Sequence, residues 1–400
     1  MAHPQLNALD RWLSAWLAQR CHNQKDLRRV AKWRVPSPMF HYMDGAADDE
    51  VTYRRNESDF DALELLPRNL IDISHIDTST TVMGQRIEFP LICAPTGMSR
   101  LFHHDGELAV SRAAARAGTI YSLSTVGTHS IEQVAQACSG PKWFQIYVFK
   151  DRGLVAEFID RCRAAQYHAL CLTIDLPLTG NRERDLRTGM TVPPQLTLRS
   201  WLDFALRPLW SLAHVTSDPF TLANVAHRVQ AGDLNTLQGY IGQQFDRSVT
   251  WDDARQMVEQ WNGPFAVKGI LTVDDAKRAV EIGANCLILS NHGGRQLDHV
   301  PSPIAILPEI LDAVGDRAEV IVDGGVRRGT DILKALALGA RACMTGRGYL
   351  YGLGAGGEAG VDRALQLFKT SLTRDMALLG CRTVSEIKRH HVRYRPRLRD

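Results

Sequence analysis

The sequence lacks the features that would place it across a membrane, in a disulfide scaffold or on nucleic acid. No uninterrupted apolar run approaches the roughly 18 residues that a membrane-spanning helix requires, so we expect no membrane-crossing segment. The eight cysteines include no C-x-x-C pair and no zinc spacing, and we expect no metal site. The formal net charge is only +3, which gives no reason to expect a nucleic-acid partner.

Little in the sequence indicates export. Cys93, Cys171, Cys286 and Cys343 lie in apolar runs, which indicates buried, reduced thiols. The segment MAHPQLNALDRW has no basic start followed by an apolar stretch, so we expect no signal peptide and a cytoplasmic location.

Basic residues gather near the other end of the sequence. They are Lys388, Arg389, Arg393, Arg395, Arg397 and Arg399. A solvated tail is the simplest interpretation. Contact with anionic lipid or with a neighbouring subunit is the alternative.

From about residue 90, short apolar runs alternate with helical patterns. The eight predicted strands are 91–94, 119–122, 143–147, 169–174, 265–268, 286–290, 319–323 and 342–345. Nearly continuous apolar residues are typical of parallel strands that are covered on both faces. Repeated βα units favour a closed (β/α)₈ TIM barrel over an open sheet. We expect one domain over residues 1–400, with the barrel at 90–380.

Two segments fall outside this repeat. Residues 1–60 have a helical pattern and predict an N-terminal helical extension. Residues 184–248 form a long insertion after strand 4, more than a plain connection needs. Within it, apolar residues recur every three or four positions, with Pro208 expected as a kink, at Leu198, Trp201, Leu202, Ala205, Leu209 and Leu212. A membrane-surface helix, a lid and a subunit contact each fit this pattern.

Polar residues collect at the predicted carboxyl ends of the strands, where barrels carry their active sites. Two of these ends predict a phosphate site, because glycine backbones approach an anion closely and arginines add charge. The residues concerned are Gly324, Gly325, Arg327, Gly346 and Arg347. Glycines that only make tight turns are the alternative.

A second group predicts acid–base chemistry on an anionic substrate. His292 and Arg295 are three residues apart, so a guanidinium could hold a carboxylate while an imidazole takes a proton. Asp175 is a candidate partner for the imidazole. An exposed ion-pair network is the alternative. Lys268 follows an apolar run, and is either a Schiff-base nucleophile or a fixed charge beside an electron-rich cofactor; the phosphate site favours the second.

These residues resemble those of the FMN-dependent L-2-hydroxy acid dehydrogenases and oxidases, the group that contains glycolate oxidase, L-lactate dehydrogenase and mandelate dehydrogenase. The resemblance runs over about residues 38–385 and is carried most specifically by SNHGGRQLD. The other matching motifs are YMDGAADDE, APTGM, SLST, WFQIY, TIDLP, GNRERD, VKGI and DGGVRRGTD.

The resemblance implies a role for each site residue. His292 would be the catalytic base with Asp175 as its partner, and Lys268 would lie near the flavin N1–O2 edge. Arg295 and Arg182 would hold the substrate carboxylate. The hydroxyls of Tyr42 and Tyr147 would assist them. The implied FMN contacts are Pro95, Thr96, Gly97, Ser124, Gln145, Thr173, Lys268, Ser290, Asp323, Gly324, Gly325, Arg327, Gly346 and Arg347.

Three positions bear on substrate and acceptor. Val126 stands where glycolate oxidases carry Trp and, with Thr179, predicts a roomier pocket that suits lactate or an aryl hydroxy acid. Gly97 stands where many oxidases have Ala, and the insertion resembles that of the membrane-bound dehydrogenases. We therefore expect a peripheral enzyme on the cytoplasmic face of the inner membrane that passes electrons to a quinone or respiratory carrier. By resemblance we expect a homo-tetramer.

Three rival hypotheses remain. The first is an oxidase that reduces O₂ to peroxide. The second is another FMN barrel, such as an isomerase, which the pair His292 and Arg295 disfavours. The third is a non-catalytic flavin-binding or membrane-docking protein, which an intact set of catalytic groups disfavours.

Overall fold

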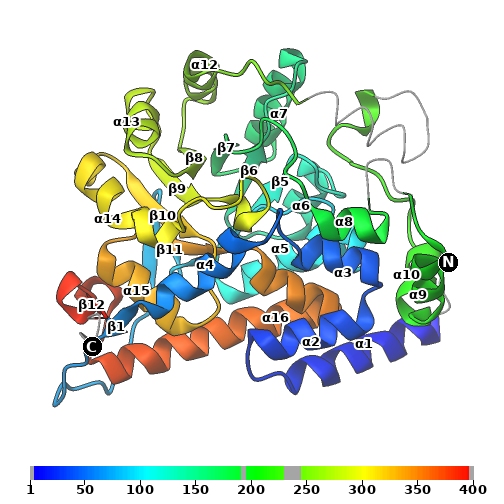
Figure 1. The fold of residues 1–400 in the computed structure, drawn as a ribbon, viewed down its shortest axis with the longest axis horizontal. Coiled ribbons are helices and arrows are strands. Elements are labelled where there is room, and N and C mark those ends of the chain that lie inside the picture. The colour runs from blue at the N-terminus through cyan, green and yellow to red at the C-terminus, as the bar shows by residue number, and fades with distance from the viewer. Residues whose placement is uncertain (1–3, 191–194, 229–244, 396–400) are drawn as a thin grey trace.

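A computed structural model describes residues 4–190, 195–228 and 245–395, and a closed barrel of eight parallel strands forms its centre (Figure 1). The strands follow the order β10-β11-β4-β5-β6-β7-β8-β9 around the barrel. Their bounds are β4 (Leu91–Cys93), β5 (Tyr121–Ser124), β6 (Lys142–Ile146), β7 (Ala169–Thr173), β8 (Phe265–Ile270), β9 (Cys286–Ser290), β10 (Glu319–Asp323) and β11 (Ala342–Thr345). The predicted (β/α)₈ fold class is confirmed.

Apolar residues fill these strands because the strands are covered on both faces. Every residue of β4, β5, β6, β7, β9 and β11 is buried. The four cysteines that the sequence placed in strands, Cys93, Cys171, Cys286 and Cys343, are buried free thiols, as predicted.

The second barrel strand begins two residues later than predicted. The preceding helix ends at Gly118, whose φ of +73° suits a glycine. Thr119 still belongs to the helix end, because its backbone N–H donates to Ala114 O at 3.0 Å. The range 119–122 was therefore wrong. Since β5 runs instead from Tyr121 to Ser124, Ser124 lies at its carboxyl end.

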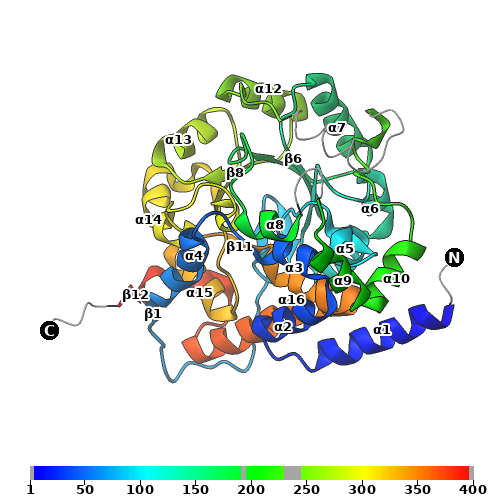
Figure 2. The same cartoon turned by 45° about the vertical axis from the view of Figure 1, so that its right-hand side comes forward.

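Helices surround the strands and form a ring in Figure 2. They are α5 (Gly106–Ala117), α6 (Ile131–Ala137), α7 (Arg152–Ala164), α12 (Trp251–Trp261), α13 (Val273–Glu281), α14 (Pro303–Val314), α15 (Gly329–Leu338) and α16 (Arg347–Leu379). Helix α16 has 33 residues, with a backbone break at Gly356 and Gly357. It packs against α1, α2, α5 and α15, and so joins the N-terminal extension to the barrel.

The N-terminal extension is helical, as expected, and reaches over the barrel. Its helices are α1 (Pro4–Gln19), α2 (Gln24–Arg34), α3 (Ser37–Asp44) and α4 (Val51–Asp61). Two short antiparallel pairs follow: β1 (Leu63–Leu65) with β12 (Val392–Tyr394), and β2 (Thr80–Val82) with β3 (Gln85–Ile87).

The hairpin of β2 and β3 closes one end of the barrel. Val82, Met83 and Ile87 share a buried cluster with barrel-interior residues such as Trp143 and Ile288. The Met83 backbone also bonds the Glu319 carboxylate at 2.9 Å, and Glu319 begins β10. The hairpin therefore covers the amino ends of the strands, and the functional groups lie at the opposite end.

The insertion carries α8 (Glu183–Thr188), α9 (Leu198–Ala205), α10 (Pro208–Thr216) and the short η2 (Ala226–Arg228). Pro208 was expected to kink a single helix, but this prediction is wrong. Pro208 begins the separate helix α10, because proline suits the first turn of a helix and cannot continue the helix before it. The parts of the insertion at 191–194 and 229–244 lie outside the described residues, as do Arg397 and Arg399. Among the described residues, no helix has both the length and the apolar character needed to cross a bilayer.

Candidate active site

A large cavity of about 760 Å³ opens at the carboxyl ends of the strands. Helices α3 and α4 contribute Tyr42 and Tyr53 to its wall. Most of the predicted site residues line it: Tyr42, Pro95, Thr96, Gly97, Tyr147, Arg182, Lys268, His292, Arg295, Asp323, Gly324, Gly325, Arg327, Gly346 and Arg347. The remaining predicted residues do not line the cavity. They lie near or just beyond the carboxyl ends of barrel strands, and they are Ser124, Gln145, Thr173, Asp175 and Ser290.

His292 lines the cavity, and its imidazole is held by a carboxylate. Its Nδ1 lies 2.9 Å from Asp175 Oδ1. Burial raises the pKa of Asp175, but the field and hydrogen bond of His292 and the charge of Lys268 outweigh burial and lower the pKa overall. Since an ionised carboxylate only accepts, Nδ1 donates to Asp175, and Nε2 is the nitrogen on the other side of the ring, 3.5 Å from the hydroxyl of Tyr147.

The backbone at His292 is itself unusual. Its φ is +57°, in the left-handed region that few residues other than glycine adopt. The His292 N–H donates to Ser290 Oγ at 3.1 Å, and the next residues form the short helix η3 (His292–Gly294). The strained turn after β9 thus directs the imidazole toward Asp175, which follows β7.

Lys268 forms a compact charged cluster with side chains of two neighbouring strands, β9 and β10. Its Nζ lies 2.8 Å from Ser290 Oγ and 2.8 Å from Asp323 Oδ2, and the serine hydroxyl donates to the same carboxylate at 2.8 Å. Burial lowers the pKa of Lys268, but Asp323 and Asp175 outweigh burial and raise it overall. The amine is therefore charged. This favours the fixed-charge interpretation over the Schiff-base nucleophile, which needs a neutral amine.

Two guanidinium groups lie beside the ring of Tyr42. Arg295 is 4.9 Å and Arg182 is 5.9 Å from its centroid. Within the described residues, Arg295 donates to two carbonyl oxygens, those of Tyr42 at 2.6 Å and Gly45 at 3.0 Å. Burial and then the charge of Arg182 lower the pKa of Arg295 to about 9, which still leaves it charged at neutral pH. Two neighbouring cations of this kind require an anion, and a carboxylate suits both.

The sequence analysis missed Asp185, which lies at the same wall. Its carboxylate is 4.0 Å from Arg182 Nη1, and its Oδ1 is buried without a hydrogen-bond partner among the described residues. Burial raises the pKa of Asp185 against the lowering fields of Arg295 and Arg182. The motif GNRERD contains this aspartate, but nothing in its spacing shows that it faces the arginines.

The glycine-rich ends of β10 and β11 leave room for an anion. A Cβ at Gly324 or at Gly346 would meet no atom closer than about 3.5 Å. Gly346 caps the start of α16 without a side-chain hydrogen bond, so this helix presents its positive end to the cavity. The backbone N–H groups of Arg327 and Arg328 instead donate to Asp331, at 2.8 and 2.9 Å. The helix whose N-terminus is open to a phosphate is thus α16, and not α15, which follows β10.

The two arginines of the phosphate motif differ in their partners. Arg327 pairs with Glu57 on α4 at 3.1 Å. Arg347 donates to the carbonyls of Gly293 at 2.8 Å, Gly45 at 2.7 Å and Met43 at 3.2 Å. Arg347 therefore also ties the N-terminal extension to the loop after β9, a role that the sequence did not indicate.

Asn56, on α4, is another residue that sequence reasoning missed. It exchanges hydrogen bonds with Asn291, at 2.8 and 2.7 Å, and lines the cavity. A Cβ at Gly325, where φ is +79°, would lie 1.7 Å from the Asn56 carbonyl oxygen, so only glycine fits there. No local signal in the sequence pairs residues so far apart.

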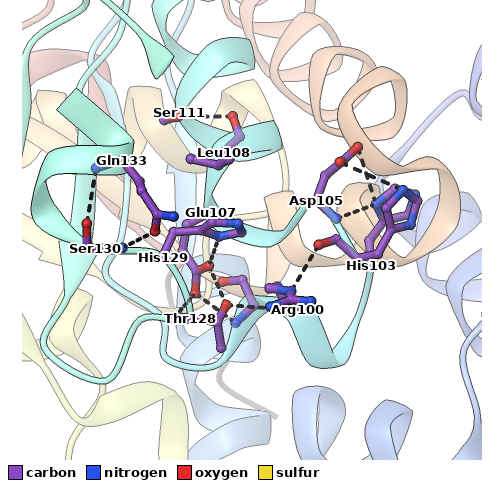
Figure 3. A network of polar contacts seen from close by, with 12 residues as sticks. Arg100, His103, Asp105, Glu107, Leu108, Ser111, Thr128, His129, Ser130 and Gln133 are labelled. Carbon is purple, nitrogen blue, oxygen red and sulfur yellow. Dashed lines mark hydrogen bonds and ion pairs between the residues drawn. The ribbon is translucent and has the colours of Figure 1, made fainter. Parts of the chain in front are cut away.

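A buried carboxylate anchors the loops that follow β4 and β5, as Figure 3 shows. Glu107 accepts from Ser99 N–H at 3.0 Å, from Thr128 N–H at 2.9 Å and from His129 Nδ1 at 2.8 Å. Burial raises the pKa of Glu107, but these hydrogen bonds and the charge of His129 lower it overall. The ion pair therefore fixes both loops, which carry Gly97 and Val126 into the cavity wall.

One cluster outside this cavity could hold a metal ion, although the sequence analysis expected none. His103, His104 and Asp105 place one ligand atom each within 4.8 Å of one another. The Nδ1 of His103 already accepts the backbone N–H of Asp105 at 3.3 Å. Only its Nε2 is therefore free for a metal while that bond persists.

The cavity fits a flat heterocycle that carries a phosphate. Gln145 Nε2 and Thr173 Oγ1, near the carboxyl ends of β6 and β7, are buried without partners among the described residues. Neither residue lines the cavity as it stands, but a ring with alternating donors and acceptors that is bound against these strand ends would satisfy both atoms. The charged amine of Lys268 and the open N-terminus of α16 fit an electron-rich ring and a phosphate, respectively.

Comparison with known proteins gives a consistent family. The family model described as FMN-dependent dehydrogenase matches residues 31–394. The chain is 42% identical over 364 residues to L-lactate dehydrogenase of Caulobacter vibrioides, covering 90% of this chain and 95% of that protein. It is equally, 42%, identical over 369 residues to L-lactate oxidase of a Nostoc species, covering 91% and 96%.

Among solved structures, that of the monotopic membrane protein (S)-mandelate dehydrogenase superposes with a TM-score of 0.90 at 36% identity, covering 94% of this chain and 100% of that one. The family model, the relatives and the superposed structure agree on one family. The chain therefore belongs to the FMN-dependent dehydrogenase family and is an FMN-dependent oxidoreductase.

Proposed function

We propose that the protein oxidises an L-2-hydroxy acid of lactate to mandelate size to its 2-keto acid and passes the electrons to a quinone or respiratory carrier. One observation carries the chemistry. The imidazole of His292, held by Asp175, and the guanidinium groups of Arg295 and Arg182 line the same cavity. A base and a carboxylate clamp are what oxidation of a 2-hydroxy acid requires.

In this proposal the arginines position the acid. Arg295 and Arg182 hold the substrate carboxylate, helped by the hydroxyls of Tyr42 and Tyr147. Tyr147 lies 3.5 Å from His292 Nε2, so a substrate that contacts its hydroxyl also meets the imidazole. His292 takes the proton that the oxidation releases, and Asp175 stabilises the resulting imidazolium.

Bound FMN supplies the acceptor for the two electrons. The residues proposed around its ring are Pro95, Thr96, Gly97, Ser124, Gln145, Thr173 and Lys268, and those around its ribityl chain and phosphate are Ser290, Asp323, Gly324, Gly325, Arg327, Gly346 and Arg347. Lys268 offers a fixed positive charge, kept ionised by Asp323, that would stabilise negative charge developing on the ring.

The proposed substrate size follows from the wall of the cavity. Val126 and Thr179 line it together with the apolar side chains of Leu176, Met190 and Phe245. These residues leave an apolar space that suits a methyl or phenyl group better than a second charge. Anaerobic bleaching of the flavin by (S)- and (R)-2-hydroxy acids, from glycolate through lactate to mandelate, tests this. Bleaching by no (S)-acid would refute the proposal.

The proposed acceptor rests on the surface of the insertion. Leu198, Trp201, Leu202 and Leu206 are 60–78% exposed on and just after α9. Such a patch is costly in water, and a bilayer surface would cover it. The related (S)-mandelate dehydrogenase is a monotopic membrane protein. We propose the cytoplasmic face of the inner membrane as the location.

We further propose that the protein assembles as a homo-tetramer. In each subunit, residues 1–400 form one domain, with the barrel at 90–380.

Reoxidation of the reduced flavin separates this proposal from an oxidase. Stopped-flow reoxidation by air should be slow compared with reoxidation by a short-chain quinone, and fast second-order reaction with O₂ would favour the oxidase.

A deletion tests the proposed membrane contact. Deleting residues 196–215 should release the protein from membranes while hydroxy acids still bleach its flavin. A deletion variant that still sediments with membranes would contradict the docking surface.

A further inference from the structure

A second, smaller cavity of about 210 Å³ lies beside the insertion. Its wall comes from α10 on one side and from α1 and α2 on the other, segments that lie close together in Figures 1 and 2. The residues that matter below are Trp33, Phe102, His103, Arg207, Trp210 and Ala213. None of them belongs to the predicted catalytic set.

Phe102 separates this cavity from the flavin cavity. It is the residue that lines both, and only 2% of it is exposed. Its ring stacks on Tyr42 with centroids 6.4 Å apart. The side chain that separates the two cavities is thus an aromatic ring in contact with the substrate clamp, a short path for electron transfer.

The lining of the second cavity suits a neutral aromatic ligand with hydrogen-bond acceptors. Arg34 is paired with Asp10, and Arg207 with Asp203. Each of these two guanidinium groups is therefore already balanced by a carboxylate, which disfavours a phosphate or a carboxylate as the ligand.

Two buried N–H donors of lining residues have no acceptor among the described residues. They are Trp210 Nε1 and Arg207 Nε. A buried donor without an acceptor is costly, and a ligand carbonyl would remove that cost. An apolar cavity of about 150 Å³ binds benzene. The larger cavity here has room for a six-membered ring with small substituents.

The cavity also reaches the proposed membrane surface. Leu206 and Trp33 line it and are 75% and 64% exposed, respectively. Leu206 belongs to the exposed apolar patch on and after α9. A ligand with an apolar tail could therefore place its ring inside while its tail stays in the lipid.

We propose that this cavity binds the head ring of a lipid-soluble para-quinone, which accepts electrons from the flavin across Phe102. The inference rests on the proposed function and adds the place where the acceptor binds. One quinone takes up the two electrons and two protons removed from one hydroxy acid, and leaves as quinol while the acid leaves as 2-keto acid. The quinone carbonyls accept hydrogen bonds from the Trp210 and Arg207 donors.

Photolabelling of the detergent-solubilised holoenzyme with a short-chain azido-quinone tests the site without using activity. We expect labelled peptides to contain residues 102–104 or 206–214. Ala213→Phe should fill the cavity and reduce labelling at least about tenfold. Val215→Phe is the matched control, because Val215 is on the same helix, is 83% exposed and does not line the cavity.

A second pair of variants covers the case in which Ala213→Phe does not fold. Trp33 and Trp12 are both 64% exposed, but only Trp33 lines the cavity. Trp33→Ala should weaken labelling and Trp12→Ala should not. Labels confined to the wall of the flavin cavity, or labelling equal in both members of each pair, would overturn the proposal.

Anaerobic bleaching by hydroxy acid is measured on the same samples. Its loss in the unmodified protein would refute the proposed oxidation, whereas bleaching together with misplaced labels would refute the quinone site alone.

Discussion

Replacing Asp175 with Asn tests the proposed base most directly. Asn keeps the size of the side chain and removes the charge that lies 2.9 Å from His292 Nδ1. Two unit charges about 4 Å apart interact by about 4 kcal/mol at an effective dielectric constant of about 20. A hydrogen bond to a charged group contributes about 1.5–3 kcal/mol. The imidazolium that forms in the reaction should therefore lose about 2–4 kcal/mol, which slows proton abstraction roughly 30- to 1000-fold.

The assay is the rate of anaerobic flavin bleaching at saturating hydroxy acid, measured by stopped flow. The affinity for the acid should change little, because Arg295 and Arg182 remain in place. The flavin content of the Asn variant serves as the folding control. A bleaching rate within about fivefold of the unmodified protein would show that the imidazolium does not need this carboxylate, and would refute the assignment.

Three further predictions follow from other contacts. Binding of an unreactive carboxylate analogue should weaken as pH rises through about 9, where Arg295 loses its charge, and Arg182→Met should move that limb to higher pH; a limb that stays in place would contradict the proposed coupling. Gly97→Ala would place a Cβ 2.5 Å from Val126 Cγ2, so thermal unfolding should show a loss of about 1–3 kcal/mol that Val126→Ala restores; no loss would mean that the loop yields. Glu107→Gln should cost about 3 kcal/mol near neutral pH. Because the pKa of Glu107 is lowered by folding, its contribution is present above the ordinary carboxyl pKa and is lost at lower pH, so the two proteins should converge in acid, and a constant difference would count against the ion pair.

The barrel could be predicted from the sequence because its strands are buried on both faces. Continuous apolar runs give the strands, and glycines such as Gly118 mark where helices end. The boundary of β5 could not be predicted, because the backbone N–H of Thr119, next to an apolar run, is used by the end of the preceding helix. Element type thus follows from local pattern, whereas bounds depend on which backbone groups are already bonded.

The site divides in the same way. Ser290 and Asp323 end neighbouring strands, and Lys268 lies two residues before the end of β8, the next strand, which runs to Ile270 and not to 268 as predicted; the barrel alone thus brings the three together. The contribution of the N-terminal extension follows no such rule. Tyr42 was indicated only by resemblance, and Asn56 was not indicated at all, because the packing of α4 on η3 joins segments far apart in the chain. The second cavity depends on α10 meeting α1 and α2, which no local pattern encodes.

The hairpin of β2 and β3 has a kinetic consequence. Because Val82, Met83 and Ile87 close the barrel at the amino ends of its strands, a hydroxy acid and its product enter and leave at the carboxyl ends. The keto acid should then compete directly with fresh substrate. If the acceptor uses the second cavity beside α10, it need not wait for that exchange, and the keto acid should inhibit competitively against the hydroxy acid but not against the quinone.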